Sequence, residues 1–170
     1  GEDLPDTLRH IKFRQPQWTA DARAVYYARY PQKPSGEGDD SKQMSVYRHR
    51  IGEPVEKDRH IYSITDHPTR YPYPYVSDDG RYLVHYVYDG RQSTGIHYHR
   101  LDGNGEVVGP VVKLIDTFDA EYGFLDVIDD VMYLRTNAGA PNGRIVAIDL
   151  KSKDKTWRDV VPEQNYAIVS

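Results

Sequence analysis

The sequence predicts an all-β protein built from about three four-stranded blades of a β-propeller. Composition is the first indication, because 15 tyrosines accompany 13 glycines and 11 prolines, as in proteins made of many short strands joined by turns. The second indication is a loose internal repeat. The third is the lack of helical periodicity: the best helix candidate, residues 116–122, has no apolar stripe at the helical period.

The repeat is clearest where two β-rich segments flank an acidic turn. This pattern occurs in residues 18–30, 76–88 and 127–136. Equivalent turns lie about 50 to 58 residues apart, which is close to the length of a propeller blade. Each copy is followed by a third β-rich segment and a closing one; the third segments are residues 44–50, 95–101 and 144–150, and the closing segments are residues 55–63, 107–115 and 156–161.

These segments divide the chain into blade-like units over residues 16–63, 70–115 and 122–161. Residues 1–15 are expected to end a preceding blade, and residues 166–169 to begin the next. An open arc of blades leaves two blade faces uncovered. We therefore expect the chain to be a segment of a longer protein or to assemble with copies of itself.

Residues 70–75, Arg-Tyr-Pro-Tyr-Pro-Tyr, allow two interpretations. Their composition suggests a polyproline recognition segment. They can also form the inner strand of the second blade, because proline blocks ladder hydrogen bonds on one side and so suits a strand edge at the central channel. We favour the inner strand and treat its tyrosines as candidate ligand contacts.

Charge and composition exclude several classes of function. The 22 basic and 26 acidic side chains give a net charge of −4, which argues against a nucleic-acid partner and a polybasic membrane anchor. Cysteine is absent, which excludes disulfide scaffolds, thiolate metal sites and cysteine nucleophiles. The sequence contains no run of about 18 apolar residues, which a membrane-spanning helix would need. The first residues are acidic, unlike the basic start of a signal peptide. We expect no membrane partner and a cytoplasmic or periplasmic location.

The residues themselves point to no catalytic or metal-binding site. His97 and His99 share a strand face, as metal ligands could, but no carboxylate stands at clear ligand spacing, so no metal or other cofactor is expected. Acidic pairs at residues 39–40, 78–79 and 129–130 could be glycosidase carboxylates or calcium ligands, yet capping of turns accounts better for the last two. None of the serines lies in a Gly-x-Ser-x-Gly elbow.

Short motifs follow one another along nearly the whole chain. They are Ile-Lys-Phe at 11–13, Trp-Thr-x-Asp at 18–21, Tyr-Tyr-x-x-Tyr-Pro-Gln at 26–32, Ser-Asp-Asp-Gly-Arg-Tyr at 77–82, Val-Lys-Leu-Ile-Asp-x-Phe-x-x-Glu-Tyr at 112–122, Thr-Asn at 136–137, Pro-Asn-x-Arg-Ile at 141–145 and Val-Val-Pro-Glu at 160–163. Each motif alone has low specificity. Taken in this order, they resemble the propeller of the prolyl oligopeptidase family.

In that family a seven-bladed propeller caps an α/β-hydrolase domain that carries the Ser, Asp and His triad. The resemblance implies that this chain covers middle blades of such a propeller and that its parent is a proline-specific serine endopeptidase. Its partners would be the hydrolase domain of the same parent chain and short proline-containing peptides, whose access the propeller would gate. No triad residue has a counterpart here, so no catalytic residue is assigned and the segment alone should be inactive.

The resemblance places four residues in the substrate pocket. Phe13 matches the family's pocket phenylalanine in type and spacing, with a core aromatic as the alternative. Tyr71 corresponds to an apolar pocket residue shortly before the Ser-Asp-Asp-Gly motif. Tyr88 stands where the family has a substrate-binding arginine. Arg91, three residues later, could take over that role, although strand pleating would put it on the opposite face.

Two other functions stay open beside this one. A self-assembling propeller-type module that binds a ligand or protein without catalysis would also account for the repeat and the tyrosine-rich channel. The propeller of a dipeptidyl-peptidase or acylaminoacyl-peptidase is the nearest enzymatic alternative, but such propellers match these motifs less well. The favoured interpretation is a non-catalytic propeller segment of a prolyl-oligopeptidase-like peptidase.

Overall fold

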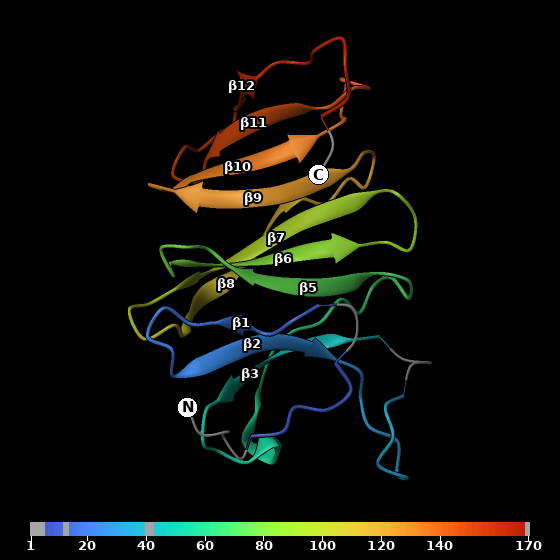
Figure 1. Cartoon of the computed structure of the whole chain (residues 1–170), viewed down its shortest axis with the longest axis vertical. Helices are drawn as coiled ribbons and strands as arrows, with labels where there is room; N and C mark the ends of the chain where they lie inside the picture. Colours follow the sequence, from blue (N-terminus) through green and yellow to red (C-terminus); the bar gives the residue numbers. More distant parts are fainter. Residues whose placement is uncertain (1–5, 12–13, 40–42, 169–170) are drawn as a thin grey trace.

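The protein consists of three four-stranded antiparallel sheets stacked along its long axis (Figure 1). The computed structural model describes residues 6–11, 14–39 and 43–168. Within these ranges the only helical element is one turn of 3₁₀ helix, Val55–Lys57, and no helix among them could cross a membrane. The predicted all-β class with four-stranded blades is confirmed.

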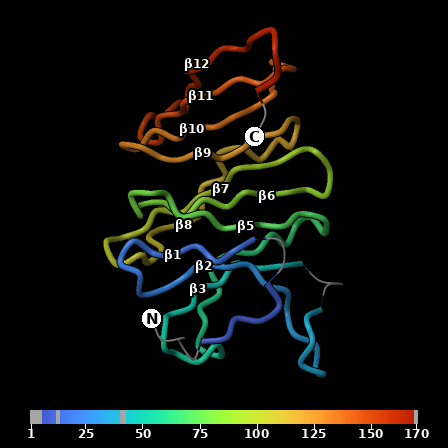
Figure 2. The backbone as a smooth tube through the Cα atoms, viewed as in Figure 1, coloured from blue at the N-terminus to red at the C-terminus, as the bar shows by residue number. Residues whose placement is uncertain are grey.

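Each sheet is a meander in which strands adjacent in sequence are also paired in space. Figure 2 shows that the chain completes one sheet before it enters the next, from blue to red. The first sheet contains β1 (Gln17–Trp18), β2 (Ala24–Arg29), β3 (Ser45–Arg50) and β4 (Arg59–Tyr62); the second contains β5 (Tyr71–Val76), β6 (Tyr82–Tyr88), β7 (Thr94–Leu101) and β8 (Val107–Ile115); the third contains β9 (Tyr122–Ile128), β10 (Val131–Thr136), β11 (Arg144–Asp149) and β12 (Trp157–Val161).

The first turns of the first two sheets share one hydrogen-bonding pattern. The Thr19 hydroxyl donates to Asp21 Oδ1 at 2.6 Å and accepts the Ala24 N–H at 3.1 Å. Because the aspartate caps its own turn, it needs no partner from another sheet. The same pattern recurs at the β5–β6 turn, formed by Ser77, Asp79 and Tyr82.

The β5–β6 turn packs directly on the turn of the first sheet. Gly80 has a positive φ of 69°, and a Cβ at this position would lie 2.5 Å from the Cβ of Ala20. Both the backbone conformation and the close approach therefore require glycine. The third sheet instead has a two-residue turn, in which Asp129 and Asp130 have φ values of 50° and 64°, as a type I′ hairpin requires.

Strands β6 and β7 of the second sheet are buried on both faces, because alternate residues contact different neighbours. In β6, Leu83 and Val87 pack in the core shared with the first sheet, and Val84 packs in the core shared with the third. All three are 0% exposed. The third sheet completes its core with Met132, Leu134, Val146 and Ile148.

The predicted segments match the strands with one clear difference. The first closing segment, predicted over residues 55–63, begins with the 3₁₀ turn, and only Arg59–Tyr62 pair as β4. The proline-containing segment is an edge strand, as the inner-strand interpretation predicts, because β5 pairs only with β6. In residues 6–11 the structure shows a single bridge, from Ile11 to Arg29, so a preceding blade over residues 1–15 stays a prediction.

Candidate functional site

Five tyrosines gather on one face of the second sheet, at its inner edge. Residues two apart on a strand project from the same face, and the β5–β6 register sets Tyr71 opposite Tyr88 and Tyr73 opposite Tyr86. Tyr75 continues the row along β5. We call this set the tyrosine face: Tyr71, Tyr73, Tyr75, Tyr86 and Tyr88.

The tyrosine face combines a buried centre with partly exposed flanks. Tyr73 is 8% exposed and packs with Tyr30 and Met44, while the other four members are partly buried. The Tyr75 ring lies 5.9 Å from the ring of Phe124 in β9, so the row reaches the inner strand of the third sheet. The face is thus fixed by packing and still accessible along part of its length.

Burial favours the protonated form of two hydroxyls of this face. Burial raises the pKa of Tyr73 to about 12, and burial also raises the pKa of Tyr86. Both groups therefore act as neutral donors and acceptors at neutral pH. The guanidinium of Arg14 lies 6.0 Å from the Tyr73 ring centroid and 5.7 Å from that of Tyr75, which is within the range of a cation–π contact.

The structure brings together two of the four predicted pocket residues. Tyr71 and Tyr88 face each other across β5 and β6. Arg91 is exposed in the connection after β6, and its N–H donates to Asp89 Oδ1 at 3.0 Å. Because β6 ends at Tyr88, strand pleating does not decide where the Arg91 side chain points. Phe13 lies outside the described residues.

The histidine pair singled out in the sequence belongs to a buried polar cluster. His97 Nε2 donates to Asp116 Oδ1 at 3.0 Å, so its Nδ1 accepts the Tyr62 hydroxyl, which lies at 2.7 Å. His99 Nδ1 lies 2.8 Å from His85 Nε2. Burial lowers the pKa of all three imidazoles. Among the described residues no group of three or more His, Cys, Asp or Glu side chains could hold a metal ion.

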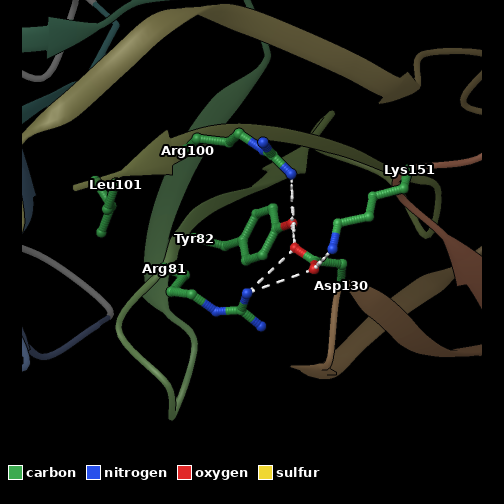
Figure 3. Close-up of a pocket in the computed structure, with 6 residues that line it drawn as sticks. All are labelled: Arg81, Tyr82, Arg100, Leu101, Asp130 and Lys151. Carbon is green, nitrogen blue, oxygen red and sulfur yellow. Dashed lines mark hydrogen bonds and ion pairs between the residues drawn. The ribbon is translucent and has the colours of Figure 1, made fainter. Parts of the chain in front are cut away.

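Asp130 has a role that sequence analysis missed. Its turn position is as predicted, but its carboxylate is buried and accepts hydrogen bonds from the Tyr82 hydroxyl and from Arg81 Nη1 at 3.4 Å (Figure 3). Lys151 Nζ lies 2.5 Å from Oδ2. These donors lower the pKa of Asp130 to about 2. With Arg100, they line a cleft of about 220 Å³ between the second and third sheets.

We call this cluster the clamp, because it joins the second sheet to the third; its members are Arg81, Tyr82, Arg100, Asp130 and Lys151. It does not have the arrangement of a reaction centre. Each charged group already has an opposite charge beside it, and burial together with Asp130 raises the pKa of Tyr82, so its hydroxyl is not activated as a nucleophile. No local sequence pattern would have revealed it, because the side chains that meet Asp130 are distant in the chain. The candidate binding surface is therefore the tyrosine face.

Comparison with known proteins places this fold. The whole chain, residues 1–170, matches the family model described as prolyl oligopeptidase, N-terminal beta-propeller domain. The chain belongs to the prolyl oligopeptidase family. The resemblance seen in the sequence motifs is confirmed, as is the assignment to the family's propeller.

Relatives and solved structures agree with this assignment. Prolyl oligopeptidase A of Amanita bisporigera is 29% identical over 98% of the chain, and the prolyl endopeptidase of Elizabethkingia meningoseptica is 29% identical over 95%. The structure of prolyl oligopeptidase B from Galerina marginata, bound to a 35mer hydrolysis and macrocyclization substrate, is 28% identical and matches 95% of the chain with a TM-score of 0.85.

The chain corresponds to a minor part of these prolyl oligopeptidases. It spans 23% of the length of the Amanita and Elizabethkingia relatives and 23% of the Galerina structure.

Proposed function

We propose that this chain is a non-catalytic part of the propeller of a proline-specific serine endopeptidase, where it gates access of short peptides and lines part of the substrate pocket. The match of the whole chain to the family's propeller model carries the proposal. The partners are the α/β-hydrolase domain of the same parent chain and short proline-containing peptides.

The positions of the pocket candidates support this role. Tyr71 begins β5 and Tyr88 ends β6, so both lie at the same end of the second sheet, beside the connection that carries Arg91. A pair of partly buried aromatic rings offers a proline ring a flat apolar surface with polar hydroxyl tips. Phe13 would add a third aromatic ring to this wall.

The chemistry of cleavage belongs elsewhere in the parent protein. Acyl transfer needs an activated serine and donors that stabilise an oxyanion, and we assign neither to this chain. The propeller's contribution is steric and orienting: it excludes large substrates and holds the residues next to the scissile bond.

Kinetics of the parent enzyme test the proposal. Tyr71→Ala should raise KM for a proline-containing peptide about tenfold, since a large buried contact is lost, while kcat changes little. Tyr133→Ala is the matched control, because Tyr133 is a partly buried tyrosine of the third sheet, and it should leave KM unchanged. Unchanged KM in Tyr71→Ala would remove Tyr71 from the pocket.

Phe13→Ala provides the corresponding test of Phe13. If Phe13 contacts substrate, KM rises, and the free energy that this rise represents exceeds the loss in free energy of unfolding. A large loss of melting temperature at constant KM would return Phe13 to the propeller core. A parent protein without any proline-specific cleavage would overturn the proposed function as a whole and favour the self-assembling module.

A further inference from the structure

The tyrosine face presents aromatic rings to a ligand, but the strand at its edge offers few backbone N–H donors. β5 is an edge strand, and such an edge normally offers unpaired N–H and C=O groups to an added strand. Pro72 and Pro74 lie opposite Val87 and His85 in the register with β6. Proline has no N–H, so two alternate positions of β5 lack a donor. Side chains must therefore supply part of the recognition that a peptide at this edge would otherwise obtain from backbone donors.

Arg14 supplies a positive charge on this aromatic surface. Its guanidinium carbon lies 6.0 Å from the ring centroid of Tyr73 and 5.7 Å from that of Tyr75, and the side chain is exposed. No carboxylate among the described residues pairs with it. A guanidinium beside aromatic rings keeps its fork of N–H donors, which can bind a carboxylate with two parallel hydrogen bonds.

We propose that Arg14 and the tyrosine face together form a subsite for a carboxylate-bearing segment of the peptide, next to proline or aromatic residues. The inference rests on the proposed function and deepens it, because it names the class of peptide that the propeller selects. Tyrosine rings stack on the proline or aromatic side chain, and Arg14 pairs with the carboxylate. That carboxylate is either the C-terminus of the peptide or a Glu or Asp side chain.

Binding of matched peptides to the full parent protein tests this subsite without relying on turnover. Three fluorescent peptides share one proline-containing sequence with a non-cleavable bond after proline. One ends in a carboxylate, one in a carboxamide, and one in a carboxamide with an added glutamate. Anisotropy should show that a carboxylate-bearing form binds about tenfold more tightly than the neutral form; which of the two forms gains identifies the source of the carboxylate.

Substitutions assign the effect to Arg14. Arg14→Gln should abolish the preference for carboxylate, and Arg14→Lys should keep part of it, because charge remains while the planar fork is lost. Arg158→Gln is the matched control, since Arg158 is exposed on the outer strand β12, and it should keep the full preference. Tyr75→Leu should weaken all three peptides by a similar factor.

Two outcomes would overturn the subsite. The first is a wild-type protein that binds all three peptides equally; the second is a preference that survives Arg14→Gln. These outcomes are separate from failure of the proposed function. A parent that cleaves after proline without this preference lacks the subsite, whereas a parent that shows the preference and cleaves nothing has the subsite but not the peptidase role.

Discussion

Each of the two interfaces between neighbouring sheets contains a tyrosine hydroxyl that donates to a side chain of the adjacent sheet, and the two acceptors are of different kinds. Between the first and second sheets, the Tyr62 hydroxyl donates to a neutral imidazole, His97, and its ring packs 4.5 Å from that of His85. Between the second and third sheets, the Tyr82 hydroxyl donates to an ionised carboxylate, Asp130. The first hydrogen bond needs an uncharged acceptor, and the second has a charged one.

Location explains this difference. The histidine cluster lies inside the stack: His85 is 0% and His97 1% exposed, and a charge there would lose its hydration. Asp130 lies at a turn, where the side chains of Arg81 and Lys151 are 47% and 65% exposed. Solvated cations can reach a carboxylate at the rim of the stack, which they could not do at its centre. Four predictions test this contrast.

Neutralising Asp130 should have the largest effect. Asp130→Asn keeps the shape and tolerates the positive φ, but it leaves Lys151 and Arg100 without their counter-charge, so the free energy of unfolding should fall by about 2 to 3 kcal/mol. Urea unfolding measures this change. Asp129→Asn is the control, since Asp129 is exposed in the same turn; equal effects of the two substitutions would show that the turn matters and the clamp does not.

Removing each tyrosine hydroxyl compares the two interfaces directly. Tyr82→Phe deletes a donor to an ionised group and should cost about 1.5 to 3 kcal/mol, whereas Tyr62→Phe deletes a donor to a neutral imidazole and should cost about 0.5 to 1.5 kcal/mol. Both rings are retained, so packing is preserved. Thermal unfolding at neutral pH gives the two values, and a larger loss for Tyr62→Phe would reverse the contrast.

The interfaces should also respond to different ranges of pH. Burial lowers the pKa of His97, so the unfolded chain binds more protons below about pH 6.5 and stability falls there as the pH drops. Asp130, with its pKa lowered from 3.8 to about 2, loses its contribution only as the pH falls from about 4 to about 2. Burial alone would lower the pKa of His49, but its hydrogen bonds with Asp58 and Asp6 raise it overall, so His49 offsets part of the first effect.

A histidine variant isolates the contribution of the cluster. In His97→Gln, the loss of melting temperature between about pH 7.5 and pH 5.5 should be smaller than in the wild type. His60→Gln is the control, because His60 is exposed on β4, and it should keep the wild-type slope. An unaltered slope in His97→Gln would mean that His97 does not contribute to the loss of stability in this range.

The smallest effect is expected at the rim of the clamp. Arg100 Nη2 lies 3.6 Å from Asp130 Oδ1, and its side chain is 55% exposed. Arg100→Gln should cost about 0.5 kcal/mol at low salt and less in high salt, because solvent and ions screen an exposed pair. A loss as large as that of Asp130→Asn would place Arg100 at the centre of the clamp.

Much of the fold and part of the site follow from residues close together in sequence. Alternating side chains and turn residues predict the strand pairs, and the prolines at 72 and 74 predict that β5 is an edge strand. The same alternation puts Tyr71 and Tyr73 on one face. Residues close together in the chain are enough to predict these features, because the alternation of side chains along a strand and the geometry of a turn are local properties.

What only the tertiary structure decided are the contacts between sheets. Asp79 and Asp130 both look like turn aspartates in the sequence, yet Asp79 caps its own turn while Asp130 accepts the hydroxyl of Tyr82 from another sheet. Arg14 likewise comes to lie against Tyr73 and Tyr75 without any local pattern to announce it. The physical reason is that the stacking of whole sheets fixes which distant side chains meet, whereas strand period and turn chemistry fix only which face each side chain occupies.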